Sequence, residues 1–187
     1  MKKSNISKNV IQRMPRYLRT LDELAQEGVN RISLGVQSSD DAILRGIGRI
    51  HTWEQVKTAV ESARQAGFDN LSLDLIYGLP DQTMGIWQQT LADAVALAPE
   101  HISAYGLKLE PGTPLWQRRE TIALPDDDLQ ADMYLCAVDY LAKNGYGQYE
   151  ISNFARPGRA SRHNLKYWHM EEYAGFGPGA HSDWGGV

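Results

Sequence analysis

Apolar and polar residues alternate in three short runs of the chain, RISLGVQ (31–37), NLSLDLIYGLP (70–80) and HISAYGLKLE (101–110). A period of two predicts β-strands, because successive strand side chains point to opposite faces. Segments 52–68 and 83–99 come after the first two runs and place apolar residues at the spacing of one helix face. Alternating strands and helices predict an α/β fold with parallel strands covered by helices.

The pattern changes after Glu110. PGTPLW predicts a turn, and the segment 124–146, which opens with acidic residues, predicts one long helix. The remainder predicts a strand over 148–154, a short helix over the motif SRHNLKYWHM (161–170) and a last strand over 173–183. Three strand–helix units do not close a (β/α) barrel, which has eight in its full form. The chain is therefore expected to be part of a larger, TIM-like architecture.

One face of the predicted sheet is small and polar. The leucine-rich faces of the first two runs are expected to meet the helices, whereas the third run is ambiguous. The other, inner face is then expected to carry Ser33, Gly35, Gln37, Ser72 and Asp74, joined by Ala104, Gly106 and Lys108 if the third run follows. A packed barrel interior prefers bulky branched side chains, so this face predicts a cavity. The alternative is a tight core with a few satisfied polar groups.

Asp74 is the sharpest feature of that face. A carboxylate within LSLDLIYG is costly to bury without donors, so a structural partner such as Arg49 or the hydroxyls of a ligand should bond it. Ligands of α/β sheets bind beyond the carboxyl ends of the strands. Gln37, Asp74 and Lys108 lie in the second halves of their runs, as that rule requires.

Bulk properties narrow the classes of function. The net charge is −4, without a Lys/Arg stripe beyond the first 20 residues, so a nucleic-acid partner is not indicated. No apolar run reaches the ~18–20 residues of a membrane span, and the N-terminus lacks the apolar region of a signal peptide. A cytoplasmic location is the default, and peripheral membrane association stays compatible with the sequence. Cys136 is the only cysteine, which excludes an internal disulfide and an all-cysteine metal or Fe–S site within the chain.

The motif SRHNLKYWHM concentrates histidine and aromatic residues. Tyr167 follows His163 at i+4, on the same helical face, and Trp168 offers apolar area to a flat ligand. Spacing alone favours ordinary packing over a site, and His169 is expected to be a surface neighbour. The glycines of GFGPGAHS lack the G-x-G-x-x-G spacing and a following helix, so they do not indicate a dinucleotide site.

Six motifs in order carry a specific resemblance. GVQSSDDAILRGIGRIHT, LDLIYGLPDQT, EHISAYGLKLEPGTPL, YEISNFARPG, RHNLKYW and GFGPGAHS together resemble the oxygen-independent coproporphyrinogen oxidase family of radical S-adenosylmethionine (SAM) proteins, and most of all its heme-chaperone branch. The resemblance runs from about Val29 to the last residue and implies a partial (β/α) barrel with SAM across the strand ends. It divides the chain into an N-terminal segment that does not match (1–28), the barrel units (29–112), and the barrel end with the start of an α+β C-terminal region (113–187).

The resemblance also implies functional residues. The positions that match the family's SAM contacts are Gln37, Arg49, Asp74, Lys108 and His181. An acceptor such as Asp74 suits ribose hydroxyls or an amino group, and the fixed charge of Arg49 suits a carboxylate. RHNLKYW corresponds to the heme-associated motif of the chaperone branch, which makes His163 the expected heme ligand beside Tyr167 and Trp168. The implied partners are heme or a porphyrin and a heme-accepting protein.

The chain departs from the family in one decisive respect. Radical SAM chemistry needs a [4Fe–4S] cluster held by a CxxxCxxC loop after the first strand, and this sequence has no such loop. Cys136 sits within the predicted long helix, where a buried, inert thiol is expected. The sequence is thus expected to be a fragment that lacks the cluster loop and the usual C-terminal domain. Reductive cleavage of SAM is not expected from this chain alone, although the full-length form would bind the cluster.

Three functions compete at this stage. The first is a heme-binding, heme-trafficking chaperone of the radical SAM fold, which rests on the His163 motif. The second is an oxygen-independent coproporphyrinogen III oxidase of porphyrin biosynthesis, which decarboxylates propionates with SAM as oxidant. The third is a non-functional truncated remnant. The sequence favours the chaperone.

Overall fold

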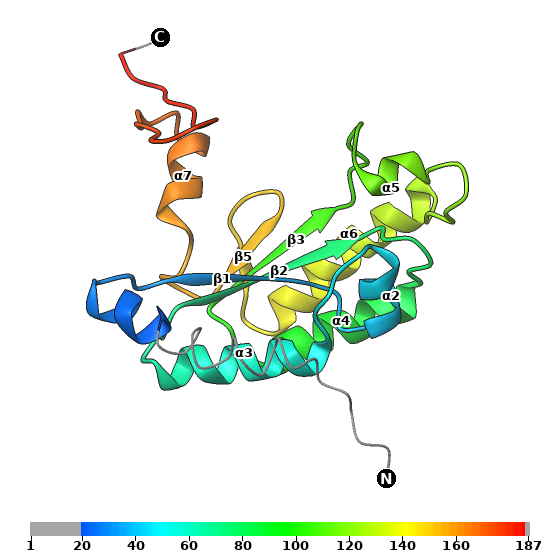
Figure 1. Cartoon of the computed structure of the whole chain (residues 1–187), viewed down its shortest axis with the longest axis horizontal. Helices are drawn as coiled ribbons and strands as arrows, with labels where there is room; N and C mark the ends of the chain where they lie inside the picture. The colour runs from blue at the N-terminus through cyan, green and yellow to red at the C-terminus, as the bar shows by residue number, and fades with distance from the viewer. Residues whose placement is uncertain (1–19, 186–187) are drawn as a thin grey trace.

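The computed structural model of the chain describes residues 20–185 and contains one five-stranded sheet (Figure 1). Its strand order is β1-β2-β3-β5-β4. The parallel part consists of β1 (Ile32–Gln37), β2 (Leu71–Tyr77) and β3 (His101–Gly106). The strands β5 (Asn153–Ala155) and β4 (Gly147–Gln148) continue the sheet in antiparallel fashion. The α/β class and the partial parallel sheet expected from the sequence are confirmed.

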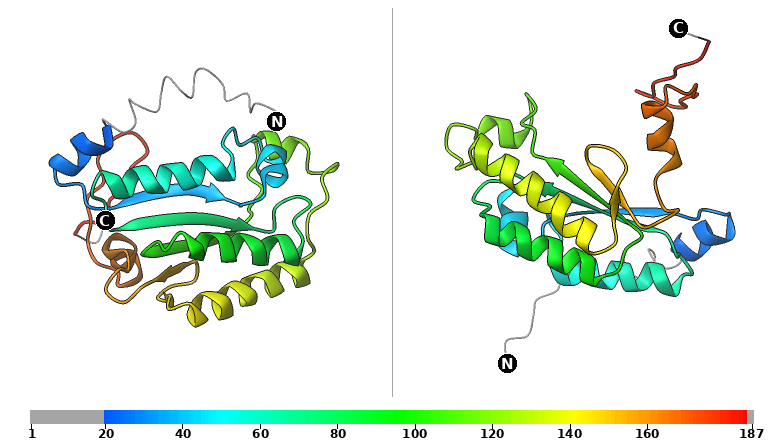
Figure 2. Two further views of the ribbon diagram at one scale, coloured as in Figure 1. Left: turned by 90° about the horizontal axis from the view of Figure 1, so that it is seen from below. Right: turned by 180° about the vertical axis from the view of Figure 1, so that it is seen from behind.

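The three longest helices cover one face of the sheet, and no helix lies flat on the other face among the described elements (Figures 1 and 2). They are α3 (Trp53–Gln65), α4 (Met84–Ala96) and α6 (Asp127–Lys143). Shorter helices lie outside this layer, among them α2 (Asp41–Gly46), α5 (Pro114–Gln117), α7 (Arg162–Trp168) and a helix over residues 20–26. Side-chain caps start the long helices: Thr52 forms a capping box with Gln55, and Thr83 accepts from the Ile86 amide.

The core lies between the sheet and these helices. Leu71, Leu73 and Leu75 of β2 are fully buried against it, as the alternation predicted. Trp87 of α4 is the largest fully buried side chain, and its Nε1–H donates to the Met133 carbonyl of α6 at 2.8 Å. The leucine face therefore meets the helices, which leaves the opposite face of the sheet for polar residues.

The structure decides which face of the third strand, β3, meets the helices. In the parallel register Leu73 lies opposite Ile102 and Leu75 opposite Ala104, so Ile102 and Ala104 join the core. Of the two orientations left open by the sequence, the one with Ala104 and Gly106 on the inner face is therefore wrong, because side chains of paired positions share a face. Lys108 lies beyond the end of β3 and is exposed. The inner face carries His101, Ser103 and Tyr105 instead.

Other elements differ from the expectation in the C-terminal half. The run 148–154 is not one strand, because β4 and β5 form a hairpin in which Gln148 pairs with Phe154. No strand spans 173–183, where a single antiparallel bridge joins Tyr173 to Asp183. The turn PGTPLW includes the start of α5, capped by Thr113. The short helix expected within 161–170 is confirmed as α7.

Candidate functional site

The open face of the sheet gathers polar side chains from neighbouring strands. Gly35 of β1, Asp74 of β2 and Ser103 of β3 lie side by side in register, and Asn153 of β5 pairs with Ser103. Asp74 is half-buried and accepts a hydrogen bond from the Ser33 hydroxyl at 2.8 Å. A carboxylate has about four lone-pair positions, so acceptor capacity remains for a ligand. The partner of Asp74 is Ser33 and not Arg49, the structural partner considered from the sequence.

A buried acceptor beside this row lacks a partner. The side-chain amide of Asn153 donates to Glu150, whereas its oxygen Oδ1 is buried without a hydrogen bond. A buried polar atom left unpaired is unfavourable, and a donor on a ligand would remove that penalty. Because Asn153, Ser103 and Asp74 are register neighbours, their acceptors fit the hydroxyl and amino groups of a ligand such as SAM.

Gln37 closes β1 in an unusual conformation. Its φ is 68°, in the left-handed region that few non-glycine residues adopt, and the pairing with β2 is irregular between Gly35 and Gln37. The side chain is buried and folds back, so that a Cβ at Gly35 would lie 2.9 Å from Gln37 Nε2. Glycine at position 35 therefore leaves room for the Gln37 amide over the strand end.

The other predicted SAM contacts lie in loops. Arg49 is exposed after α2, which follows β1, and Lys108 is 82% exposed after β3 and pairs with Glu110 at 2.8 Å. Both loops follow the carboxyl ends of their strands. His181 lies beyond α7, in a segment that the views place at the opposite end of the sheet (Figures 1 and 2). The structure therefore brings Gln37 and Asp74 onto adjacent strands and leaves His181 apart from them.

Helix α7 stands at the amino ends of the parallel strands. Ala155, the last residue of β5, pairs with His101, the first residue of β3, so the chain leaves the sheet at this end. Ser161 then caps α7 by accepting from the Asn164 amide at 3.4 Å. The helix rises from the side of the sheet that the long helices do not cover (Figure 1). With the exception of His181, the predicted SAM residues thus lie towards the opposite end of the strands from the predicted heme residues.

An exposed aromatic cluster surrounds His163 on α7. The Tyr167 hydroxyl and His163 Nε2 are 2.8 Å apart, and the two rings meet edge to face with centroids 4.9 Å apart. Tyr173 packs against the Tyr167 ring at 4.7 Å and lies 6.4 Å from the His163 ring. Sequence reasoning missed Tyr173, because the short bridge to Asp183 that places it leaves no periodic signal.

Trp168, the last residue of α7, is a further exposed aromatic side chain of this helix. It is 53% exposed, and Tyr167 is 47% exposed, so both can contact a flat ligand. His169 is exposed and lies 3.5 Å from Glu171, which agrees with its expected place as a surface neighbour. The candidate heme site is therefore a surface of imidazole and aromatic rings around His163.

His101 is a buried polar residue that sequence reasoning did not select. Its Nδ1 lies 2.8 Å from Ser72 Oγ, and its Nε2 lies 2.8 Å from the Tyr149 hydroxyl. Burial, with a smaller contribution from the Arg31 charge, lowers the pKa of His101 to about 3. The imidazole is therefore neutral at physiological pH. A histidine opening a buried strand was the only signal in the sequence.

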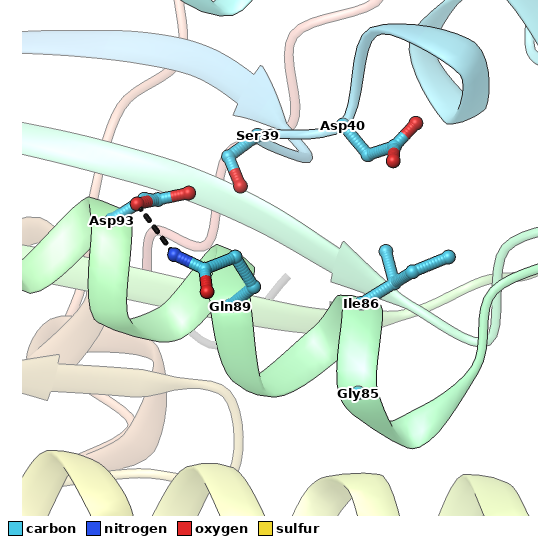
Figure 3. Close-up of a pocket in the computed structure, with 6 residues that line it drawn as sticks. All are labelled: Ser39, Asp40, Gly85, Ile86, Gln89 and Asp93. Carbon is cyan, nitrogen blue, oxygen red and sulfur yellow. Dashed lines mark hydrogen bonds between the residues drawn. The ribbon is translucent and has the colours of Figure 1, made fainter.

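A shallow pocket lies between the β1–α2 loop and α4, next to the predicted sheet site but not on it (Figure 3). Its volume is about 230 Å³, and its lining residues are Ser39, Asp40, Gly85, Ile86, Gln89 and Asp93. Asp40 already caps α2, and Gln89 donates to Asp93 at 2.9 Å. None of the predicted site residues lines this pocket.

The described residues do not fit an iron–sulfur cluster. Cys136, in α6, is a free, partly buried cysteine. Within residues 20–185 no group of three or more His, Cys, Asp or Glu side chains is placed to hold a metal ion. A [4Fe–4S] cluster would need cysteines from outside this sequence. No helix in the same range is long and apolar enough to cross a bilayer.

Comparison with known proteins gives consistent matches. The sequence profile of the Radical SAM superfamily matches residues 2–94. The heme chaperone HemW of Lactococcus lactis is 49% identical over 159 residues, which cover 84% of this chain and 42% of the relative. HemW of Bacillus subtilis is 44% identical over 166 residues, which cover 88% of this chain and 44% of the relative. The chain therefore spans less than half the length of these curated relatives.

A solved structure shares the fold. Coproporphyrinogen III oxidase (HemN) of Escherichia coli, a radical SAM enzyme, superposes with a TM-score of 0.73 at 27% sequence identity. The match covers 88% of this chain and 41% of that protein. The partial barrel seen here is thus similar to part of a larger radical SAM fold.

Proposed function

Since the chain belongs to the coproporphyrinogen oxidase-like family of radical SAM proteins that includes the heme chaperones, we propose that it binds heme through His163. In this proposal the chain is part of a protein that delivers heme to a recipient protein. The whole protein's activity is part of the proposal, because the chain spans less than half of its relatives. The cytoplasmic location expected from the sequence stays a prediction.

The exposed cluster of His163, Tyr167 and Tyr173 is the observation that carries the proposal. A neutral imidazole ligates heme iron, and the rings with Trp168 supply apolar area for the macrocycle. In this arrangement Nε2 of His163 is hydrogen-bonded to the Tyr167 hydroxyl. Iron would therefore displace that hydroxyl or bind through Nδ1.

Replacing His163 with alanine should weaken the binding of hemin by about tenfold or more and abolish the spectrum of histidine-ligated iron. Titration with hemin, followed through the Soret absorption and electron paramagnetic resonance, measures both effects. His169→Ala is the matched control, because His169 is an exposed histidine at the C-cap of the same helix. An unchanged spectrum in His163→Ala would overturn the assignment of the ligand.

Tyr167→Phe distinguishes the two possible ligands of the same cluster. Loss of the hydroxyl frees Nε2 and keeps the ring, so imidazole ligation should persist with equal or higher affinity. Tyrosine can itself ligate heme iron. If Tyr167→Phe loses hemin binding while His163→Ala keeps it, the phenol is the ligand and the role of His163 is rejected.

For SAM we propose that Gln37 and Asp74 contribute contacts on the open face, with Arg49 and Lys108 from the adjoining loops. His181, the remaining contact expected from the sequence, lies apart from these four residues and is not part of the proposed site. The unpaired oxygen of Asn153 supports a donor-bearing ligand there. SAM, when bound with a reduced cluster, supplies radical chemistry, and this chain's residues would only hold the cofactor.

Asp74→Asn should weaken binding of SAM by about tenfold, because a neutral amide loses the charge that favours hydroxyl and ammonium donors. Equilibrium dialysis with radiolabelled SAM measures the affinity without any catalytic turnover. Asp132→Asn, an exposed carboxylate on α6, is the control of equal charge change. Equal affinities for wild type and Asp74→Asn would remove Asp74 from the proposed site.

Coproporphyrinogen III oxidation is the second candidate, and the structural similarity to HemN favours it. The higher sequence identity to heme chaperones favours the first. Oxidation would need a cluster that the single cysteine of this chain cannot hold. Anaerobic assay of a longer protein that contains the cluster, with coproporphyrinogen III as substrate, separates the two functions.

A further inference from the structure

A continuous chain of hydrogen bonds joins the sheet to the start of α7. Ser72 of β2 contacts His101 of β3 at 2.8 Å, and His101 contacts the Tyr149 hydroxyl at 2.8 Å. The Tyr149 oxygen in turn accepts from the Ser161 amide at 3.2 Å and from Asn164 Nδ2 at 3.5 Å. Ser161 is the N-cap residue of α7. This series of hydrogen bonds thus ends at Ser161, the residue that caps the start of α7.

The hydrogen bonds between Tyr149, His101 and Ser72 can all be donated in the same direction, from Tyr149 towards Ser72. Tyr149 accepts two hydrogen bonds from the α7 side, so its single proton is available for His101. His101 Nε2 is then the acceptor, and its Nδ1 carries the proton that is donated to Ser72 Oγ. A neutral imidazole satisfies this scheme with one donor and one acceptor. The low pKa of His101 agrees with that neutral form.

The middle of the chain is buried. Ser72 and His101 are each 2% exposed, and Tyr149 is half-buried with its ring 5.6 Å from the His101 ring. Loss of a buried hydrogen bond leaves a polar atom without a partner, and water cannot replace the bond as it does at the surface. Each hydrogen bond of this chain therefore restrains its two partners more strongly than a surface hydrogen bond would. The buried chain is therefore suited to fix an orientation.

Neighbouring contacts hold the preceding segment but not the helix itself. Arg31 Nη1 donates to the Arg159 carbonyl at 3.0 Å, and the Arg156 amide donates to the Glu100 carbonyl at 3.0 Å. Both contacts lie before the cap. Among the described residues, Tyr149 is the side chain of the sheet region that bonds both Ser161 and Asn164.

We infer that His101 and Tyr149 are positioning residues that fix how α7 leaves the sheet, and thereby where His163 is presented. The effect on heme rests on the proposed function, whereas the effect on the helix does not. The link also connects the strand pair that carries Asp74 to the helix that carries His163. The orientation of the heme motif is thus set from inside the sheet.

Tyr149→Phe tests the inference, because it removes the hydroxyl and keeps the ring. Hydrogen exchange at the amides of Ser161, Asn164 and Leu165 should accelerate by about tenfold, since the helix start loses its tie to the sheet. Tyr146→Phe is the control: its buried hydroxyl donates to the Pro99 carbonyl and accepts from Arg156, but it bonds no residue of α7. Equal exchange of α7 in wild type and Tyr149→Phe, or equal acceleration in both variants, overturns the inference.

Two variants of His101 provide a test of rescue. His101→Gln keeps an acceptor within reach of Tyr149 and should retain part of the protection of α7, whereas His101→Leu should lose it. Equal protection in the two variants contradicts the role of the hydrogen bond. If either variant fails to fold, Tyr149→Phe still decides the outcome.

Binding of hemin separates this inference from the proposed function. Tyr149→Phe should broaden the Soret band and weaken hemin binding by about threefold to tenfold while His163 is intact. If wild type shows no histidine-ligated hemin, the proposed function fails, but the exchange data still judge the positioning role. If hemin binds through His163 equally well in both proteins, the presentation of His163 by Tyr149 is rejected.

Discussion

Replacement of Trp87 by alanine should lower the free energy of unfolding by about 3–5 kcal/mol, the largest loss expected from a single side chain here. Trp87 is fully buried between the sheet and α6. It contacts the Tyr77 ring at a centroid distance of 5.8 Å and donates to the Met133 carbonyl at 2.8 Å. Alanine leaves a cavity that the surrounding helices can only partly fill.

Urea unfolding followed by circular dichroism measures this loss as a lower midpoint at constant slope. Trp87→Phe separates volume from hydrogen bonding, because it keeps most of the ring and removes only Nε1–H. Trp184→Ala is the surface control, since Trp184 is 65% exposed, and it should change stability by less than about 0.5 kcal/mol. A loss below about 1 kcal/mol in Trp87→Ala would contradict the packing of α4 against α6.

Acidification should destabilise the fold through His101. The pKa of His101 is about 3 in the folded chain, below the ordinary value of 6.5, because burial disfavours the charged imidazole and the Arg31 charge adds to the effect. Between these two values the unfolded chain binds more protons than the folded chain. Stability from this group is therefore complete above about pH 6.5 and falls by about 1.4 kcal/mol per pH unit towards pH 3.

The comparison of wild type with His101→Gln isolates this one group, because the carboxylates titrate alike in both proteins. The groups that face the imidazole are Ser72, Tyr149 and the Arg31 charge, and none of them offers a carboxylate to stabilise the protonated form. Urea unfolding between pH 7 and pH 4 should give a steeper decline for wild type. Parallel declines in the two proteins would show that His101 does not resist protonation.

Local pattern determined most of the parallel half of the fold. The alternation in β1 and β2 identified the leucine face, because a strand buried on one side must place its apolar residues at every second position. The helical spacing before and after β2 identified α3 and α4 in the same way. For α7, the motif around His163 indicated both the helix and the shared face of His163 and Tyr167.

The third strand and the hairpin needed tertiary information. Apolar side chains occur on both sides of 101–110, so periodicity alone could not orient the strand, and the pairing of Leu73 with Ile102 decided it. The run 148–154 was divided because β5 pairs antiparallel with β3 and turns back onto β4. Register is a property of two strands, so neither run contained it.

For the candidate sites, too, some features follow from the sequence and others only from the tertiary structure. The sequence by itself determined the residue types, namely the carboxylate of Asp74 on a polar face and the imidazole of His163 in a helical aromatic motif. Only the tertiary structure decided that Ser33 bonds Asp74, that Tyr173 completes the aromatic cluster and that His101 ties the sheet to α7. Those contacts join residues distant in the chain, and their geometry comes from strand pairing and packing, which one-dimensional spacing does not contain.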